Sequence, residues 1–213
     1  MTDQAYWDSY YAEQIQRKPV SQFGAFVASE FPGLDLVIDL GCGDGRDSFY
    51  FADRGAKVLA LDSSESAIAI CNAQRALSFN KNAQFINASI AKSDCVNAVK
   101  NFMTQNQGIK SGLLYSRFVL HALTEAEEPR FLDNLAECAS TFGLSLALEF
   151  RTLKDQNLIK ETATHFRRFI DHENLKNELG KRSIKIDYCI TGRGMAKFRN
   201  DDAHIARIIA SAI

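Results

Sequence analysis

Three glycines in one short segment form the part of the sequence best suited to hold a ligand. Residues 39–45 read DLGCGDG and lie between an apolar stretch and an expected helix. Glycines at such a turn let backbone N–H groups approach a ligand where a Cβ atom would collide, and the following helix presents its N-terminus. The spacing is GxGxG, whereas turns that bind the pyrophosphate of a dinucleotide read GxGxxG. The turn therefore predicts a ligand other than a nicotinamide dinucleotide.

A second acid follows at a spacing that suits a nucleoside. Asp62 ends the next apolar stretch, 23 residues after Asp39. A ribose above the glycine turn would present two hydroxyls there, and a carboxylate is a bidentate acceptor for them. The alternative is that Asp62 caps the helix that begins at Glu65, although Ser63 or Ser64 can cap it without Asp62.

Side chains able to move protons occur at three places. These candidates are His121, His165 and Glu149. Histidine and carboxylate groups are the usual general acids and bases of enzymes. For each histidine the alternative is an ordinary packing residue.

Basic residues gather in the last third of the chain. The net charge is only −1, yet residues 1–150 carry 12 Lys and Arg against 18 Asp and Glu, whereas residues 151–213 carry 13 against 8. Arginine clusters recognise phosphate or carboxylate through paired hydrogen bonds, and the alternative is a solvated basic face. The candidates for an anion site are Arg151, Lys154, Arg167, Arg168 and Arg193.

Apolar stretches that alternate with helical stretches must position these side chains. Strands are expected at 36–40, 57–61, 83–88, 112–115 and 142–150, with helices at 46–54, 65–77, 94–103, 124–139 and about 173–179. This alternation predicts an α/β fold: a Rossmann-like, doubly wound, seven-stranded sheet, mostly parallel with an antiparallel last-strand hairpin, and helices on both faces. Residues 34–213 are expected to form a single globular domain.

The two ends of the chain depart from this alternation. Residues 3–16 predict a helix with an aromatic stripe, and a second helix follows Pro19 with Ser21 as its N-cap. Near the other end, 183–190 and 195–198 predict two strands joined by a hairpin, and 202–210 predicts a helix. With the last strand at 195–198, Arg199 falls on the opposite side of the sheet and pairs with Asp201 or Asp202.

The strand ends bring most of the candidates to one edge. Ligands of open parallel sheets bind beyond the carboxyl ends of the strands. Ser116 and Arg117 follow the fourth strand, with His121 close behind, and Arg151 follows the fifth. The hairpin turn carries Arg193 to the same edge, and His165 and Arg168 share a face if their segment is helical.

The segment VIDLGCGDGRDSFYFADRGAKVLALDSSESAI, residues 37–68, resembles the cofactor motif of the class I S-adenosylmethionine-dependent methyltransferases. The resemblance extends over most of the chain. It implies S-adenosyl-L-methionine as cofactor and S-adenosyl-L-homocysteine as product. It also implies cofactor contacts from Asp39, Gly41, Gly43, Gly45, Arg46, Asp62, Ser63, Ser89, Ser116 and Arg117. Arg46 is otherwise an exposed first-turn residue, and Ser89 stands where many members place Asp.

The resemblance also assigns a role to the beginning of the chain. In relatives, helices before the domain close over the cofactor, so residues 1–33 are expected to form a cap in which Trp7 and Tyr11 contact it. An aromatic ring can cover a sulfonium by cation–π attraction, and plain packing on the domain is the alternative. The segments EFRTLKD, THFRRFID and YCITGRGMAKFRNDDAHIARII resemble small bacterial methyltransferases of surface-polysaccharide clusters.

Composition limits the partners. Five cysteines without a CxxC pair, no visible secretory signal and no long apolar run predict a cytoplasmic protein with reduced thiols and no membrane insertion. A balanced charge argues against nucleic acid as partner. The expected partner is a small anionic molecule, and the chain is expected to be a monomer or homodimer. No clustered ligands suggest a metal.

These features predict transfer of a methyl group to a phosphate- or carboxylate-bearing metabolite or sugar. If the nucleophile is an anionic oxygen no base is needed, whereas a neutral hydroxyl requires one. Two other functions stay open. A non-catalytic S-adenosylmethionine-binding regulator shares the cofactor motif, and a nicotinamide-dependent oxidoreductase shares the sheet.

Overall fold

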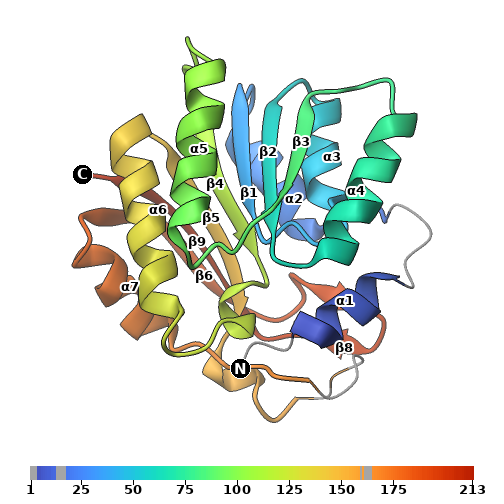
Figure 1. Cartoon of the computed structure of the whole chain (residues 1–213). Coiled ribbons are helices and arrows are strands. Elements are labelled where there is room, and N and C mark those ends of the chain that lie inside the picture. Colours follow the sequence, from blue (N-terminus) through green and yellow to red (C-terminus); the bar gives the residue numbers. More distant parts are fainter. Residues whose placement is uncertain (1–3, 13–17, 159, 161–164) are drawn as a thin grey trace.

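The computed structural model describes residues 4–12, 18–158, 160 and 165–213, and within them a single mixed sheet forms the centre of the molecule (Figure 1). The sheet has seven strands in the order β3-β2-β1-β4-β5-β9-β6. All neighbours are parallel except β9, which runs antiparallel to both β5 and β6. The predicted Rossmann-like fold with one reversed strand is confirmed.

The elements follow the expected alternation. The strands are β1 (Leu36–Leu40), β2 (Lys57–Asp62), β3 (Ala83–Asn87), β4 (Gly112–Arg117), β5 (Ser145–Arg151), β6 (Ile184–Gly192), β7 (Lys197–Phe198), β8 (Asp201–Asp202) and β9 (Ile205–Ala212). The helices are α1 (Gln4–Ala12), α2 (Gln22–Glu30), α3 (Arg46–Asp53), α4 (Glu65–Leu77), α5 (Ser93–Gln105), α6 (Glu128–Phe142) and α7 (His172–Gly180), with short 3-10 turns η1 (Leu120–Ala122) and η2 (Leu153–Asp155).

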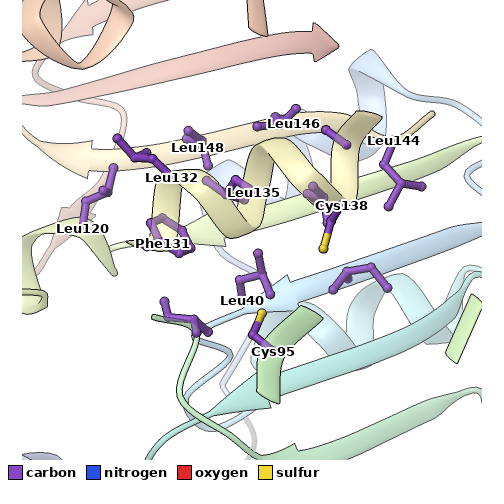
Figure 2. Close-up of a cluster of buried hydrophobic side chains, with 14 of the residues drawn as sticks. Leu40, Cys95, Leu120, Phe131, Leu132, Leu135, Cys138, Leu144, Leu146 and Leu148 are labelled. Carbon is purple, nitrogen blue, oxygen red and sulfur yellow. The ribbon is translucent and has the colours of Figure 1, made fainter. Parts of the chain in front are cut away.

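Two cores lie on opposite faces of the sheet because successive strand side chains point to opposite sides. In β1, Leu36, Ile38 and Leu40 pack under α5, α6 and α7, whereas Val37 packs under α2, α3 and α4. Figure 2 shows the first core, in which Phe131, Leu135 and Cys138 of α6 face side chains of the sheet that include Leu40, Leu146 and Leu148. The described helices include none long and apolar enough to cross a membrane.

Side-chain caps fix where two helices begin. Ser21 accepts a hydrogen bond from the N–H of Gly24 at 2.8 Å, which confirms it as the N-cap of α2. Ser64, rather than Asp62, caps α4 by accepting from the N–H of Ala67 at 3.2 Å. The predicted start of the fourth helix at Thr124 is wrong by one turn, because Thr124 forms a separate turn closed by the Glu127 carboxylate.

The helix predicted at 202–210 is wrong, because residues 205–212 form strand β9. Ile205, Ile208 and Ile209 have helical spacing, but β9 lies between β5 and β6 and residues 205–210 are all buried. A strand covered on both faces is mostly apolar along its whole length, here with Arg207 as the one buried charge of β9, so its sequence lacks the alternation that marks a half-exposed strand.

The strand predicted at 195–198 is likewise not the seventh strand of the sheet. Lys197–Phe198 and Asp201–Asp202 instead form a small separate ribbon, β7–β8, before the chain enters β9. The ribbon lies near α1, at the end of the molecule toward which β5 points (Figure 1). The predicted pairing of Arg199 with Asp201 or Asp202 is wrong, since these carboxylates bind Arg151 and Arg193.

Candidate functional site

The glycine turn between β1 and α3 has a backbone that only glycine adopts without strain. Gly41, Gly43 and Gly45 have φ angles of +84°, +53° and +72°. A Cβ atom on Gly41 would lie 2.1 Å from Cγ2 of Val119, and one on Gly43 would lie 2.3 Å from the hydroxyl oxygen of Tyr11. The turn therefore requires glycine for two reasons: its backbone angles are strained for other residues, and Val119 and Tyr11 leave no room for a Cβ atom.

Asp39, the acid before this turn, is buried beneath it. Its Oδ2 accepts a hydrogen bond from the hydroxyl of Ser48 at 2.5 Å. Burial raises the pKa of Asp39 from 3.8 to about 8, with the nearby Asp47 and Asp62 adding to the rise. The carboxyl is thus predominantly protonated at neutral pH and can donate a hydrogen bond.

Asp62 joins the end of β2 to the glycine turn. Its Oδ2 accepts from the backbone N–H of Gly43 at 2.8 Å, and its Oδ1 accepts from the N–H of Ser64 at 2.9 Å. Burial raises the pKa of Asp62, while these N–H groups oppose the rise. A backbone hydrogen bond from Ser63 also reaches this carboxylate, so three backbone N–H groups bond to Asp62. Two carboxylate oxygens have four lone pairs in all, so Asp62 can still accept from a hydroxyl such as that of a ribose.

Helix α1 lies over this turn. The Asp8 carboxylate accepts from the hydroxyl of Ser64 at 2.5 Å, which joins α1 to the start of α4. Lys18 follows α1 and forms an ion pair with Asp44 of the turn at 2.8 Å. The Tyr11 hydroxyl lies against Gly43, and burial raises the pKa of this phenol. Helix α1 therefore covers the glycine turn, and a contact of Tyr11 with the cofactor stays a prediction.

The remaining cofactor candidates surround the same edge. Arg46 lines an open groove of about 460 Å³ with Lys18, next to the turn. The Ser116 hydroxyl is buried and donates to the carbonyl of Leu40 at 2.9 Å, so it holds the end of β1. Ser63 is exposed and Ser89 half-buried after β3. Their roles in cofactor binding remain predictions.

Glu149 on β5 lies between two arginines from neighbouring strands. Its Oε1 accepts from Nε of Arg117 on β4 at 2.9 Å, and its Oε2 accepts from Nε of Arg207 on β9 at 2.8 Å. Burial raises the pKa of Glu149, and both guanidinium groups oppose the rise. Two charge-assisted hydrogen bonds hold this carboxylate, so the geometry supports a structural role more than the predicted role as a base.

Arg151, predicted to bind the acceptor, is buried between two acids. Its guanidinium donates to Asp155 at 2.6 Å and to Asp201 at 2.6 Å. Phe118 lies beside it, with the ring centroid 5.5 Å from Cζ of Arg151 and 4.4 Å from Cζ of Arg117. Phe118 has φ +58°, a strained conformation for a bulky residue, directly after β4.

His121 in η1 points into this group. Its imidazole is buried, lies 5.5 Å from the Phe118 ring, and its Nδ1 has no hydrogen-bond partner among the described residues. Burial lowers the pKa of His121 well below 6.5, and positive charge from Arg151 and Arg167 lowers it further. The side chain is therefore neutral at pH 7.

Residues 165–168 place further basic side chains near His121. Arg168 pairs with Glu128 at 2.9 Å, and its backbone N–H donates to the carbonyl of His121 at 2.8 Å. The ring of His165 stacks on Tyr6 of α1, with centroids 4.2 Å apart, and lies 3.2 Å from Arg167. Residues 165–169 are not helical, so the predicted shared helical face does not form, and 161–164 lie outside the described residues.

Two acceptor candidates lie farther out. Lys154 is exposed in η2, and Arg193 is 57% exposed beside Asp202. In the described part of the chain no group of His, Cys, Asp and Glu side chains is arranged to hold a metal ion.

Several residues of this site were not predicted from the sequence. Asp155 lies four residues after Arg151, a spacing that could have suggested their ion pair. Arg207 was assigned to a helix, and the left-handed conformation of Phe118 has no local sequence signal.

A parallel sheet with one reversed strand, a glycine turn after β1 and an acid at the end of β2 define the class I methyltransferase fold. The sequence profile described as a methyltransferase domain matches residues 34–179, and the chain belongs to this family. The methyl donor of class I members is S-adenosyl-L-methionine, the cofactor that the resemblance of residues 37–68 implied. No curated protein sequence matches the chain significantly.

Solved structures share the fold at low identity. Magnesium protoporphyrin IX methyltransferase from Synechocystis PCC 6803 with bound S-adenosylmethionine is 21% identical, with TM-score 0.57, over 97% of this chain and 78% of that one. TehB from Haemophilus influenzae is 17% identical, with TM-score 0.68, over 97% and 67%. The CcbJ methyltransferase from Streptomyces caelestis is 16% identical, with TM-score 0.68, over 97% and 96%.

Proposed function

We propose that this protein transfers a methyl group from S-adenosyl-L-methionine to a small anionic acceptor, a metabolite or sugar that bears phosphate or carboxylate. The observation that carries the proposal is the set of basic groups around His121. Besides burial, the nearby Arg151, Arg167, His165 and Arg117 lower its pKa. Arg151 is itself paired with Asp155 and Asp201, so the excess positive charge lies with Arg117 and Arg207, which share the Glu149 carboxylate. An anion is the ligand that such a site attracts.

The residues for the cofactor fit its parts. The Asp62 carboxylate, which already holds the N–H of Gly43 in the glycine turn, can also accept from a ribose hydroxyl. The groove lined by Lys18 and Arg46 suits the carboxylate of the amino-acid end. When bound, the cofactor supplies a methyl carbon activated by a sulfonium. The rings of Trp7 and Tyr11 favour that positive charge.

The arginines near the proposed acceptor site differ in the number of carboxylates with which they pair. Arg117 and Arg207 share one carboxylate, so this group carries an excess positive charge. Arg151 instead has two carboxylates and is neutralised within the protein. Burial lowers the pKa of Arg167, and the nearby charge of Arg151 lowers it further. We propose Arg167 as an acceptor contact because its charge lies close enough to His121 to lower the pKa of that imidazole.

Methyl transfer by in-line displacement needs alignment and a dry site more than elaborate machinery. The stack of Tyr6 on His165 joins α1, above the cofactor turn, to the segment that carries Arg167. One helix thereby covers both halves of the site. This contact supports an acceptor that enters between α1 and the ends of β4 and β5.

Calorimetry with S-adenosylmethionine, S-adenosylhomocysteine and NADH tests the cofactor, and a methyl-transfer assay over phosphorylated sugars, phosphonates and carboxylates tests the acceptor. We expect Arg167→Ala to raise the acceptor KM about tenfold or more, the scale of a lost charge-assisted hydrogen bond. Cofactor affinity should stay unchanged. Arg199→Ala is the matched control, because Arg199 lies over the exposed ring of Phe198.

Each contrary outcome identifies a different function. Cofactor binding without turnover of any acceptor class favours the non-catalytic regulator. Binding of NADH in place of S-adenosylmethionine favours the oxidoreductase. Turnover of neutral acceptors alone, with an unchanged KM in Arg167→Ala, contradicts the anionic acceptor.

A further inference from the structure

Ser64, at the start of α4, forms hydrogen bonds with two carboxylates. Its backbone N–H donates to Oδ1 of Asp62 at 2.9 Å, and its hydroxyl donates to Oδ1 of Asp8 on α1 at 2.5 Å. The hydroxyl oxygen also accepts from the N–H of Ala67 as the N-cap of α4. A serine hydroxyl has one proton to donate, and Asp8 receives it. The acid expected to hold the ribose and the helix expected to cover the cofactor are therefore joined through one residue.

The bond between Asp8 and Ser64 is better sheltered from water than the ion pair that follows α1. In that pair, Lys18 contacts Asp44 at 2.8 Å, and 28% of the Lys18 side chain is exposed. Ser64 is only 1% exposed. A hydrogen bond from a sheltered hydroxyl to a carboxylate is stronger than an ion pair in contact with water. Any movement that lifts α1 from the start of α4 must break this bond.

The two carboxylates that Ser64 joins repel one another. The charge of Asp8 is near enough to Asp62 to raise the pKa of that carboxyl. Placing α1 on α4 therefore costs more free energy while nothing offsets the charge of Asp62. A ribose hydroxyl that donates to Asp62 offsets part of this charge, so the repulsion from Asp8 falls. A bound ribose thus makes the contact of Asp8 with Ser64 more favourable.

We propose that Asp8 is a positioning residue that latches α1 over the cofactor through Ser64, and that a ribose hydroxyl bound to Asp62 strengthens this latch. The inference rests on the proposed function and adds a regulation of the same site. Cofactor binding and closure of α1 strengthen one another by the same factor, because the coupling of two equilibria is reciprocal. A nucleoside without ribose hydroxyls gains nothing from the latch.

Calorimetry with two nucleosides tests this coupling in the full chain. Adenosine carries the ribose hydroxyls, whereas 2′,3′-dideoxyadenosine lacks both. We expect Asp8→Ala to raise the Kd for adenosine about tenfold, the scale of one charge-assisted hydrogen bond, and to change the Kd for the dideoxy compound less than about twofold. A contact that only supports the structure affects both nucleosides alike. Equal changes in the two Kd values, or an unchanged Kd for adenosine, would therefore overturn the inference.

The dissociation of S-adenosylhomocysteine gives a second test. Because the latch acts once the ligand is bound, Asp8→Ala should raise the dissociation rate about tenfold and leave the association rate nearly unchanged. A chase of radiolabelled ligand with unlabelled ligand measures this rate. Asp8→Asn keeps an acceptor oxygen for the Ser64 hydroxyl, so it should restore part of the slow dissociation. A dissociation rate that stays the same in Asp8→Ala would contradict the latch.

Two variants serve as matched controls. Glu65→Gln removes an exposed carboxylate from the first turn of α4, and Ser9→Ala changes an exposed residue of α1. Both should leave the Kd for adenosine and the dissociation rate of S-adenosylhomocysteine unchanged. An effect of Glu65→Gln equal to that of Asp8→Ala would assign the change to charge near α4 in general and overturn the latch. Failure of the wild-type protein to bind S-adenosylhomocysteine would instead contradict the proposed function, so the two failures can be told apart.

Discussion

The carboxylate of Asp62 accepts the backbone N–H of Gly43 at 2.8 Å, so the acid that ends β2 holds the glycine turn that follows β1. The two strands are parallel neighbours, with Leu40 beside Leu61. The N–H groups of Gly41 and Cys42 also bond to the carbonyl of Leu61. The turn therefore has its shape before any ligand binds, and this preorganisation lowers the entropic cost of binding.

Asp62→Asn should weaken cofactor binding. The substitution removes the charge that receives hydroxyl donors and turns one oxygen into a donor, so we expect affinity for S-adenosylhomocysteine to fall about 10- to 100-fold, the value of a charge-assisted hydrogen bond. Calorimetry measures this change. Asp35→Asn is a matched control, because Asp35 accepts the N–H groups of Lys110 and Ser111 at 3.0 and 3.1 Å at the other end of β1. Equal losses of affinity in both variants would contradict a direct role for Asp62.

Gly41→Ala should destabilise the protein through two separable effects. The φ of +84° costs about 1 kcal/mol for a residue with a Cβ atom. The clash of that Cβ with Val119 adds a steric cost of about 1–3 kcal/mol. The double variant Gly41→Ala/Val119→Ala removes the clash. It still loses the free energy of the strained backbone and of the missing valine methyl groups.

Gly33→Ala isolates the backbone effect in the same assay. Gly33 has φ +80°, and a Cβ atom there meets nothing within 4 Å. Urea unfolding should therefore show a loss of about 1 kcal/mol for Gly33→Ala and a larger loss for Gly41→Ala. Equal losses at both positions would contradict the packing of Val119 on the turn.

Glu149→Gln should reduce stability more than a lost surface pair does. Removing the charge leaves Arg117 and Arg207 buried without a counter-ion, a change that typically costs about 3–5 kcal/mol. Glu137→Gln breaks the exposed pair with Lys100 and should cost less than about 1 kcal/mol. Denaturant unfolding compares the two variants. A stable Glu149→Gln protein with greatly reduced kcat would instead restore Glu149 as a catalytic base.

The pKa of Asp39, raised from 3.8 to about 8, predicts a specific pH dependence of stability. Between these pH values the folded chain holds a proton that the unfolded chain releases. The stabilising contribution is complete below pH 3.8 and is lost as pH rises through 8, with a slope of about 1.4 kcal/mol per pH unit. Asp39→Asn mimics the protonated carboxyl, so its stability relative to the wild type should rise with pH across this interval.

Denaturant unfolding at several pH values measures the difference between the variant and the wild type. Asp133→Asn serves as control, because its carboxylate is 64% exposed on the surface. A constant difference between Asp39→Asn and the wild type from pH 4 to 8 would show that Asp39 is ionised in the folded protein.

The sequence predicted correctly those elements whose local residue pattern matches the way they are buried in the fold. Residues 36–40 and 65–77 have the bounds expected, because a short apolar run and a capped amphipathic helix each specify one structure. Strand β9 was mistaken for a helix because its environment, two neighbouring strands and two covered faces, is tertiary and cannot be read from Ile and Ala spacing.

The candidate site divides in the same way. Asp62 and the glycine turn were predicted because their roles depend on two adjacent strands and a fixed spacing. Which arginines are neutralised was not predicted, because Arg151 meets Asp201 from a ribbon fifty residues away. Ion pairs between residues so far apart in the sequence decide whether an arginine can bind a ligand or is already neutralised by an acid. The order of residues in the sequence does not reveal such pairs.

Trp7 on α1 allows a direct test of the cap. It is the only tryptophan in the chain, and its ring lies 6.0 Å from Tyr11 and 5.2 Å from His165. A ligand that binds beneath α1 should therefore change the tryptophan emission, and we expect a saturable change on titration with S-adenosylhomocysteine. Removal of residues 1–18 should raise the Kd for this ligand at least about tenfold, because the water-excluding helix and its aromatic contacts are lost.

Phe198→Ala is a control for unspecific effects on the emission, since Phe198 is exposed on β7. Calorimetric binding with no change in Trp7 emission, and an unchanged Kd after truncation, would contradict the cap. Helix α1 would then be packed on the domain without contact with the cofactor. The contact of Tyr11 with Gly43 argues for the cap, because any ligand that lies on the middle glycine of the turn must touch or move that phenol.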